Sequence, residues 1–366
     1  MPKTQSISEG KAIIKAYSGK ISKKLPVFYN PVMKNNRDIS VLVLNAVDNN
    51  KMNIGLPMEA SGLRGIRFLK ELSKGKVGEL HMNDLSEKAV ADMKQNLKLN
   101  TMSKGSKDKK DKISKADVKK VKIFQKDANI FLLESTGFDY IDIDPFGTPN
   151  PFLDSAVKRI SREGILAVTA TDTAPLCGTF EDACIRKYWA RPLRNELMHE
   201  VGLRILIRKV QLIGAQYEKA LTPIFSYSKE HYMRVFFRCE KSKAMADEIM
   251  MQHGYHIEAG PMWKGKIWDA KIAQKIASAN SDKDLNNFLA TIAEESLIDV
   301  FGFYDLTEEC KRNKIYPIPR LDELISLIRK KGFAASRTHF RDNSIRTTMD
   351  EDEFLRAVKE ALGKKR

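Results

Sequence analysis

From about residue 40 to residue 170 the chain alternates between strand-like and helix-like segments. The strand-like runs include KVGELHMND, VKIFQ, FDYIDID and GILAVTAT, and SEKAVADMKQNLKLN, which follows the first of them, has apolar residues at helical spacing after a capping Ser86. Helices between successive strands form crossover connections, which make the strands parallel and cover both faces of the sheet. The sequence therefore predicts an α/β fold with a parallel, doubly wound sheet.

Two regions do not fit this alternation. The apolar run ISVLVLNAV is compatible with a buried strand or a helix, because so short a run does not reveal its period. HYMRVFFRCE, at 231–240, has the pattern of a last strand pair, and the chain beyond it is mostly helix-patterned. Residues 333–366 mix basic, aromatic and hydroxyl side chains, as in a helix-turn-helix-like module or an ordinary basic helical domain. We predict a boundary near residue 240, with domains at 1–240 and 241–366.

The chain of 366 residues carries 63 Lys and Arg against 47 Asp and Glu, a net charge of +16. Such an excess favours a polyanionic partner such as nucleic acid, although a solvated lysine-rich surface gives the same balance. Residues 103–122 hold nine Lys and three Asp. This segment is either a solvated surface loop or an arm that follows phosphates.

Several classes of protein are disfavoured by what the sequence lacks. No apolar run reaches the length of a membrane span, and the N-terminal residues have no signal-peptide core. The four cysteines form no CxxC pair, which argues against a zinc ribbon or a disulfide framework. We expect a cytoplasmic protein without a membrane partner.

Acidic residues stand at or near the ends of four successive strand-like segments. In chain order they are Glu59, Asp84, Asp127 and Asp144. Each one alone could be a helix cap or a turn residue. The carboxyl ends of strands are, however, where open α/β sheets bind ligands, so the set indicates a nucleoside cofactor across that edge. Asp84 would bind the ribose hydroxyls, and Asp127 or the amide of Ala128 would meet the adenine.

The turn EASGLRG, which contains Ser61 and Gly62, opens the helix after the first strand-like segment and is a candidate cofactor contact. It lacks the GxGxxG spacing that brings backbone amides to the pyrophosphate of a dinucleotide. S-adenosylmethionine has no phosphate, so methyl transfer is a better interpretation than hydride transfer.

The motif Asp144-Pro145-Phe146 describes the methyl acceptor. The Asp144 carboxylate and the Pro145 carbonyl can accept the N–H bonds of an exocyclic amine, and Phe146 can stack on the base. The base must leave its stack to reach such a pocket. The motif contains no cysteine, which disfavours a covalent thiolate mechanism.

At this point the sequence is similar to a known family. The segments VFYNPVMKNNRDISVLVL, NDLS, FDYIDIDPFGTPNPFLDSA, VTATDTAPLCGTF and CIRKYWARPLRNELMHEVGLRILI resemble the tRNA guanine-26 N2-dimethyltransferase family in its archaeal form, over most of residues 5–240. The resemblance implies a Rossmann-like class I methyltransferase sheet with helices on both faces and a smaller, mainly helical α+β C-terminal domain that binds tRNA. It also implies transfer of one and then two methyl groups from S-adenosylmethionine to N2 of guanine 26.

The resemblance also implies roles for particular residues. Arg37 and Arg67 would contact the cofactor beside Asp84, Asp127 and Ala128. Asp144 would be the catalytic carboxylate, and Phe146 and Phe28 would hold the guanine between two aromatic faces. Asp172 and Thr173, in VTATDTAPLCG, would line the same pocket.

The chain departs from the family in one respect. Many relatives have a cysteine cluster before a GPLW-like element, whereas here GPMW at 260–263 is preceded by His253 and His256. Two histidines are too few for a structural zinc site, so we expect no zinc.

Two alternatives remain open from the residues themselves. A motif such as Asp144-Pro145-Phe146 also serves methyltransferases that act on DNA adenine or cytosine or on a protein amine. A non-catalytic tRNA-binding protein could retain the same scaffold. We expect a monomer that acts on tRNA and not on DNA.

Overall fold

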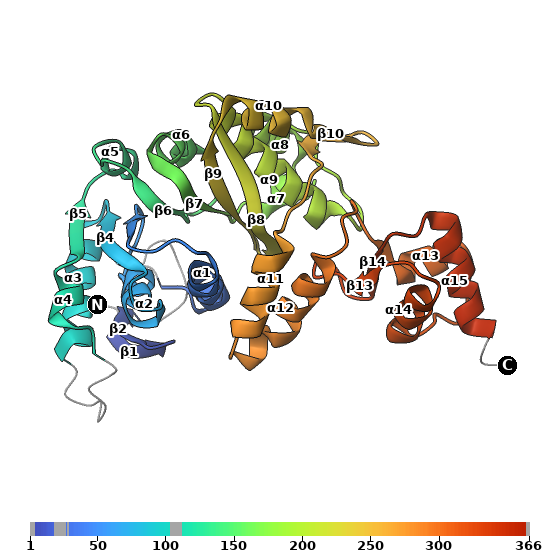
Figure 1. Ribbon diagram of the computed structural model, residues 1–366, viewed down its shortest axis with the longest axis horizontal. Helices are drawn as coiled ribbons and strands as arrows, with labels where there is room; N and C mark the ends of the chain where they lie inside the picture. The colour runs from blue at the N-terminus through green and yellow to red at the C-terminus, as the bar shows by residue number, and fades with distance from the viewer. Residues whose placement is uncertain (1–3, 18–26, 28, 103–111, 364–366) are drawn as a thin grey trace. The chain divides into compact units, whose positions relative to one another are not determined.

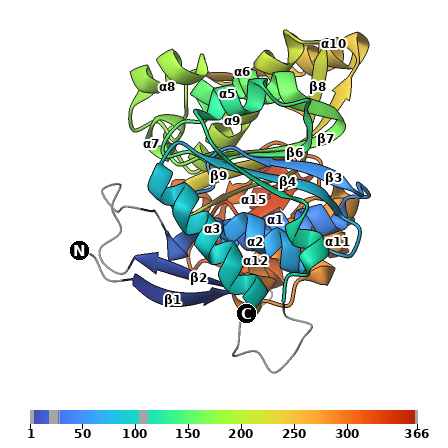
Figure 2. The same ribbon diagram turned by 90° about the vertical axis from the view of Figure 1, so that its left-hand side faces the viewer.

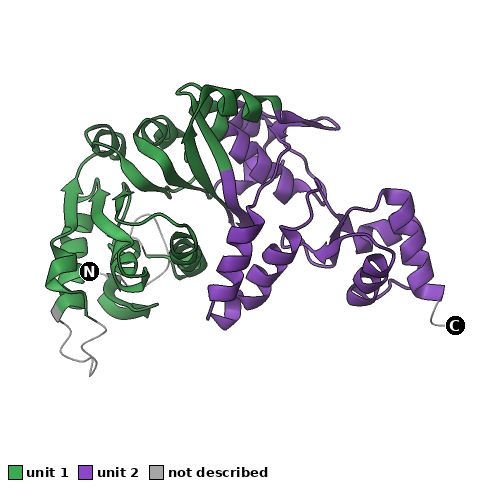
Figure 3. Ribbon diagram, viewed as in Figure 1, with its two compact units in different colours: residues 1–171, 210–222, 234–251 green, residues 172–209, 223–233, 252–366 purple. Residues whose placement is uncertain are grey.

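The computed structural model describes residues 4–17, 27, 29–102 and 112–363 (Figure 1). The chain divides into two compact units whose residue ranges interleave (Figure 3). Unit 1 comprises residues 1–171, 210–222 and 234–251, and unit 2 comprises residues 172–209, 223–233 and 252–366. The domain boundary that we predicted near residue 240 lies at the end of a strand and stays a prediction.

A seven-stranded sheet has the order β5-β4-β3-β6-β7-β9-β8, and all of it except residues 223–229 of β8 and 232–233 of β9 belongs to unit 1. Its strands are β3 (Met52–Leu56), β4 (Val77–Asp84), β5 (Val121–Gln125), β6 (Phe138–Ile143), β7 (Ile160–Ala170), β8 (Lys219–Lys229) and β9 (Tyr232–Lys241). The first five strands in this order pair in parallel. The predicted α/β sheet is confirmed.

The prediction was wrong about the last two strands. HYMRVFFRCE forms β9 alone, and its hairpin partner β8 comes from the preceding residues. Only Glu230 and His231 separate β8 from β9, so the two strands run antiparallel, because a parallel pair needs a crossover of a dozen residues or more. The sheet is therefore mixed and not wholly parallel.

Helices cover both faces of this sheet, as Figure 2 shows. Helices α1 (Lys34–Ala46), α2 (Leu63–Glu71) and α3 (Glu87–Met102) lie on one side, and α5 (Ala128–Leu133) and α6 (Asn150–Arg159) lie on the other. The ambiguous run ISVLVLNAV belongs to α1, where Ile39, Val43 and Leu44 are fully buried. The run is helical because the rest of the chain provides a sheet against which its apolar residues pack.

Local sequence signals set the starts of these helices. Asp127 caps α5 by accepting hydrogen bonds from the amides of Asn129 and Ile130, and Ser86 accepts one from the amide of Ala89. Gly62, at φ +79°, provides the left-handed residue before α2. A Cβ on Gly65 would lie 2.4 Å from the sulfur of Met82, so glycine is needed for α2 to pack this closely on β4.

An N-terminal hairpin packs beside these helices. It consists of β1 (Thr4–Glu9) and β2 (Ala12–Tyr17), which pair antiparallel. Asn100 of α3 accepts a hydrogen bond from the amide of Ile13 at 3.0 Å, and Asn96 accepts one from the amide of Lys15 at 2.8 Å. These side chains extend the hydrogen bonding of β2 to a helix in place of a third strand.

The remaining elements complete the chain. They are η1 (Pro31–Met33), α4 (Lys115–Val118) and α10 (Lys243–Met251) in unit 1, and, in unit 2, α7 (Thr173–Leu176), α8 (Glu181–Tyr188), β10 (His253–His256), β11 (Ala259–Trp263), α11 (Ala270–Ala279), α12 (Lys283–Glu295), β12 (Tyr304–Asp305), α13 (Leu306–Arg312), α14 (Leu321–Lys330), β13 (Ala335–Arg337), β14 (Ser344–Thr347) and α15 (Glu351–Gly363). Helix α9 (Met198–Ala215) begins in unit 2 and ends in unit 1. A three-stranded sheet, β12-β14-β13, packs with α13, α14 and α15 around a core that includes Leu306, Leu324, Ile328, Ile345, Phe354 and Val358.

The C-terminal part of unit 2 is therefore α+β, as predicted, but residues 333–366 are neither a helix-turn-helix nor wholly helical. They contain β13 and β14 before α15. Two of the basic residues that suggested such a module are used internally. Arg341 forms an ion pair with Asp305, and Arg346 is fully buried.

Unit 2 contains a buried network of charges around Arg346 of β14. Arg346 binds Glu200 at 2.8 Å and Glu295 at 3.0 Å, and Arg204 binds Glu200 at 2.9 Å. Glu295 also accepts hydrogen bonds from the hydroxyl of Thr338 and from the backbone amide of the next residue. The network fixes the loop between β13 and β14 against α12.

Within the described residues, no helix combines the length and the apolar character needed to cross a bilayer.

Two adjacent glutamates of α12 test this network. Glu295 is fully buried, whereas the side chain of Glu294 is 59% exposed and pairs with Arg329 at the surface. Glu295→Gln leaves Arg346 incompletely paired and should lower the free energy of unfolding by about 3–5 kcal/mol. Glu294→Gln should lower it by about 1 kcal/mol or less. Urea unfolding followed by circular dichroism measures both, and equal losses would contradict this account.

The stability of the protein should also depend on pH through the carboxylate of Glu295. Burial alone would raise the pKa of Glu295, but His339 and Arg346 outweigh it and hold the pKa below the ordinary value of 4.5. A carboxylate with a lowered folded pKa stabilises the protein above its unfolded pKa, and this stabilisation is lost as the pH falls through the folded pKa. Below pH 4.5 the wild type should therefore lose stability more steeply than Glu295→Gln.

Candidate active site

A cleft of about 530 Å³ opens in unit 1 at the carboxyl ends of the parallel strands. Its volume lies within the range of small-molecule and cofactor sites. The lining residues follow β3, β4, β6 and β7 or belong to the segment that leads into α1: Tyr29, Asn30, Met33, Arg37, Met58, Glu59, Ala60, Ser61, Leu63, Arg64, Asp84, Asp144, Pro145, Phe146, Phe152 and Thr171.

The motif Asp144-Pro145-Phe146 lies directly after β6 and lines this cleft. Phe146 is 51% exposed and presents a large apolar surface at the cleft. The turn is tied to the end of β7, because the amide of Gly147 donates to the Thr171 hydroxyl at 2.7 Å and the amide of Thr171 donates back to the Gly147 carbonyl at 3.0 Å. The position of the motif is therefore set by two neighbouring strands.

Arg64 is a residue of the cleft wall that sequence reasoning missed. It lies in the first turn of α2, lines the cleft and is buried. One guanidinium nitrogen lies 2.5 Å from Asp144 and the other lies 3.1 Å from Asp142. The signal in the sequence was its place in SGLRG, directly after a turn that we had already selected as a cofactor contact.

Glu59 stands in the wall of the cleft, as its place after the first strand suggested. Its carboxyl group accepts a hydrogen bond from the amide of Gly65 at 2.8 Å, which makes it a cap for the first turn of α2. Burial raises the pKa of Glu59 to about 8, although Arg64 acts in the opposite direction. The Glu59 carboxyl is therefore protonated at neutral pH.

Asp84 and Ser61 both line the cleft. One carboxylate oxygen of Asp84 accepts a hydrogen bond from the amide of Ala60 at 2.9 Å, and the other accepts one from the amide of Ser86 at 3.0 Å. Each oxygen has two lone pairs, so both retain acceptor capacity on the side that faces the cleft.

Arg37 lines the cleft and Arg67 does not. Both bind the buried Glu9 of the N-terminal hairpin, at 2.6–2.7 Å for Arg37 and 2.9 Å for Arg67. Arg67 is further bound to Asp38 at 2.6 Å and to Glu71 at 2.8 Å. Burial would raise the pKa of Glu9, but the two guanidinium groups lower it below the ordinary value. The cofactor role of Arg67 stays a prediction, and its side chain is already bound to carboxylates.

Three other predicted site residues, all described by the structure, do not line the cleft, and their roles stay predictions. Asp127 and Ala128 stand at the start of α5, and Gly62 precedes α2. Phe28 lies outside the described residues, although the neighbouring Tyr29 is part of the cleft wall.

The predicted contribution of Asp172 and Thr173 is also untested. Asp172 accepts a hydrogen bond from the hydroxyl of Tyr188 at 2.6 Å, and Thr173 begins α7. Their neighbour Thr171 lines the cleft.

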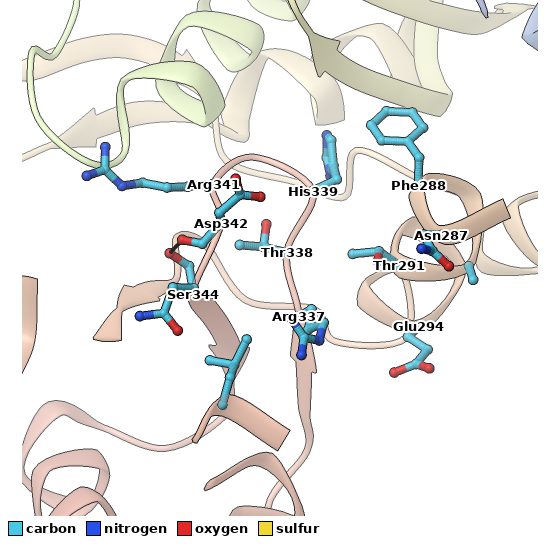
Figure 4. Close-up of a pocket in the computed structure, with 13 residues that line it drawn as sticks. Asn287, Phe288, Thr291, Glu294, Arg337, Thr338, His339, Arg341, Asp342 and Ser344 are labelled. Carbon is cyan, nitrogen blue, oxygen red and sulfur yellow. Dashed lines mark hydrogen bonds between the residues drawn. The ribbon is translucent and has the colours of Figure 1, made fainter. Parts of the chain in front are cut away.

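A second cavity, of about 560 Å³, lies in unit 2 between α12 and the loop that joins β13 to β14 (Figure 4). Its wall carries two arginines, Arg337 and Arg341, together with Glu294 and Asp342. Its charges are balanced, and its arginines already pair with aspartates. Among its described lining residues, none is a carboxylate at the carboxyl end of a parallel strand, as Asp144 is, so the cleft in unit 1 is the better candidate for chemistry.

Among the described residues, no three His, Cys, Asp or Glu side chains gather closely enough to hold a metal ion. His253 and His256 lie in β10, where the ring of His253 packs on Trp263.

The pKa of Glu59 leads to a test of this geometry. A carboxyl whose folded pKa is raised stabilises the protein fully below its unfolded pKa of 4.5, and the stabilisation is lost as the pH rises through about 8. Glu59→Gln keeps the acceptor for Gly65 and removes the titration. It should be more stable than the wild type by about 3–5 kcal/mol at about pH 9, and similar to it at pH 4.5, as measured by thermal unfolding. The exposed Glu79→Gln is the control, and the same gain there would contradict the assignment.

Comparison with known proteins identifies the family. A family model described as N2,N2-dimethylguanosine tRNA methyltransferase matches residues 3–259 and 256–359. The tRNA (guanine(26)-N(2)/guanine(27)-N(2))-dimethyltransferase of Aquifex aeolicus is 37% identical, over 97% of this chain and 95% of its own. The tRNA (guanine(26)-N(2))-dimethyltransferase of Pyrococcus horikoshii is also 37% identical, over 96% and 97%.

A solved structure agrees with these relatives. Trm1 from Pyrococcus horikoshii, in complex with S-adenosyl-L-methionine, superposes with a TM-score of 0.82 at 36% identity and covers 97% of this chain and 99% of its own. The Rossmann-like fold and the resemblance inferred from the sequence are confirmed, and the chain belongs to the N2,N2-dimethylguanosine tRNA methyltransferase family.

Proposed function

We propose that this protein transfers one and then two methyl groups from S-adenosylmethionine to the N2 amine of guanine 26 in tRNA. The observation that carries the proposal is the placement of Asp144-Pro145-Phe146 in a cleft at the carboxyl edge of the sheet. The family gives the reaction and its substrate, and the cleft supplies groups suited to an amine and to a nucleoside.

The cleft fits the cofactor in volume and in chemistry. Asp84 can accept hydrogen bonds from the ribose hydroxyls with the lone pairs that Ala60 and Ser86 leave open. Met33, Met58 and Leu63 provide an apolar wall. S-adenosylmethionine supplies a methyl group on a positively charged sulfur, which is its only role in the chemistry.

The residues of the motif act on the acceptor. The lone pair of guanine N2 is delocalised into the ring, so the amine is a weak nucleophile. Asp144 and the Pro145 carbonyl would each accept an N–H bond and thereby direct the lone pair toward the methyl group. When N2 takes the methyl group it gives up one proton, which the Asp144 carboxylate would accept and pass to solvent, and the cofactor would leave as the neutral thioether. N2-methylguanine still has one N–H, so Asp144 can orient it for the second transfer.

Guanine must leave its stack to enter the cleft. Phe146 presents an exposed aromatic face for it, and Phe28 is proposed as the opposite face. Arg64 stands in the cleft where Arg67 does not, so Arg64 is the stronger candidate for a contact with the cofactor. Arg67, Gly62, Asp127 and Ala128 remain proposed cofactor contacts on the strength of the resemblance alone.

The remaining parts of the proposal concern the whole protein. The C-terminal part, residues 241–366, would bind tRNA, and the lysine-rich segment 103–122 would contribute phosphate contacts. The protein would act as a monomer in the cytoplasm and not on DNA. Size-exclusion chromatography with light scattering tests the oligomeric state.

Asp144→Asn tests the catalytic assignment. The variant keeps the shape of the side chain but loses the charged acceptor, so turnover should fall by about 100-fold or more while tRNA affinity stays within about twofold. Mass spectrometry of nucleosides from an unmodified tRNA transcript measures N2-methylguanosine and N2,N2-dimethylguanosine. The exposed Asp154→Asn of α6 is the control. An active Asp144→Asn enzyme would exclude the proposed role.

The same assay identifies the target. A transcript with adenine in place of guanine at position 26 should not be methylated. A transcript with adenine at position 27 should still be methylated. The second position is included because the name of the Aquifex aeolicus relative contains it. Methyl transfer from labelled cofactor to DNA or protein, and none to tRNA, would replace the proposal with another amine methyltransferase.

Phe146→Ala tests the stacking of the base. Stacking of a base on an aromatic ring contributes about 1–3 kcal/mol, so the KM for tRNA should rise by about 5- to 150-fold. Phe146→Tyr keeps the ring and should behave like the wild type. An unchanged KM for Phe146→Ala would show that the base does not stack there.

A further inference from the structure

We propose that Asp142 and Arg234 are positioning residues for Asp144, which they hold through Arg64 in a line of four alternating charges. The inference rests on the proposed role of Asp144 and extends it to residues that have no contact with the cleft. All four side chains belong to unit 1.

The line begins on β9, the neighbour of the edge strand β8. Arg234 of β9 is fully buried, and its two terminal nitrogens lie 3.1 and 2.8 Å from the two carboxylate oxygens of Asp142. Asp142 then binds Arg64 at 3.1 Å, and Arg64 binds Asp144 at 2.5 Å. Asp144 is the one member of the line at which the acceptor would bind.

Neutral side chains hold both arginines in place. The Ser40 hydroxyl accepts a hydrogen bond from Arg64 and another from Arg234, each at 2.9 Å. Arg234 also donates to the hydroxyl of Thr169 at 2.5 Å, and Arg64 donates to Asn36 at 3.0 Å. A guanidinium group is planar and rigid, so these contacts fix the direction in which Arg64 meets Asp144.

Asp142 is ionised at the centre of this arrangement. Burial alone would raise its pKa, but Arg234 and Arg64 outweigh burial and lower it. Tyr140 donates a further hydrogen bond to Asp142 at 2.6 Å. A buried ion pair often contributes little to stability compared with apolar residues of similar size. The buried ion pair of Asp142 and Arg234 is better explained by its effect on the position of Arg64.

The arrangement has a consequence for Asp144. Among the described residues its hydrogen-bond partner is Arg64, which binds one carboxylate oxygen and leaves the other for an amine N–H. If Asp142 is removed, Arg64 loses one of the contacts that fix its direction, and if Arg234 is removed, Asp142 itself is less firmly held, so in both cases Arg64 can turn with Asp144. Misplacement of a reacting group by about 1 Å can lower the rate by about 100-fold.

The test separates a positioning role from a structural one. Arg234→Met and Asp142→Asn should lower kcat for tRNA methylation by about 10- to 100-fold, with the KM values for tRNA and cofactor within about twofold of the wild type. Arg234→Lys should recover part of kcat, because it restores a charge beside Asp142. Tyr140→Phe removes one hydrogen bond to Asp142, keeps the ring, and should lower kcat by a few-fold.

Arg204→Met is the matched control. Arg204 is almost as deeply buried as Arg234 and is bound to Glu200, but it lies in unit 2. Its loss should lower stability and leave kcat unchanged when the assay is run well below the unfolding temperature.

The pH profile of kcat provides a second readout. The charged and titratable groups that line the cleft together with Asp144 are Tyr29, Arg37, Glu59, Arg64 and Asp84. Arg234→Met removes a positive charge near these carboxylates, which favours their protonation, so the fall of kcat at low pH should move to higher pH. Asp142→Asn removes a negative charge, so the same fall of kcat should move to lower pH. A loss of packing in the two variants would not move the fall of kcat at low pH in opposite directions.

Each outcome decides between the two claims. If Asp144→Asn is inactive while folded Asp142→Asn and Tyr140→Phe have the wild-type kcat and pH profile, the positioning role is excluded and the proposed function stands. If Asp144→Asn is active, the proposed role of Asp144 itself fails. If kcat falls only in proportion to the unfolded fraction, also in Tyr140→Phe, the residues are structural and the inference is wrong.

Discussion

The ion pairs of Arg64 with Asp142 and Asp144 are the contacts on which the site depends. Arg64 comes from the first turn of α2, and the two aspartates come from the end of β6 and the residue after it. These elements meet because β3, which leads into α2, pairs in parallel with β6. Removal of one partner from a buried ion pair is strongly destabilising, so strand order, helix packing and the position of the acceptor motif are parts of one arrangement.

Buried carboxylates also bind buried arginines at two other places among the described residues. Glu9 of the N-terminal hairpin binds Arg37 and Arg67, and so attaches the hairpin to α1 and α2. In unit 2, Glu200 and Glu295 enclose Arg346 and fix the loop after β13. These buried arginines are matched by buried carboxylates. The excess of positive charge in the sequence therefore falls mainly on other residues, where it remains available to a polyanion.

Local patterns were sufficient for much of the fold. The parallel strands, the caps Ser86 and Asp127, and the left-handed Gly62 follow from periodicity and turn chemistry within a few residues. The strand-end rule also selected Asp84 and Asp144, both of which line the cleft. The errors concern β8, which the alternation did not reveal and which pairs with β9 through a two-residue turn, and the strands β13 and β14.

The sequence by itself determined the class of sheet, the acceptor motif and, through resemblance, the family and its chemistry. Only the tertiary structure decided that Arg64 rather than Arg67 lines the cleft, that Glu9 holds Arg37, and that Arg234 stands behind Asp142. Ser40 and Arg234 are 194 residues apart and share a hydrogen bond. The function of a buried charge depends on which carboxylate the fold brings to it, and no spacing along the chain encodes that partner.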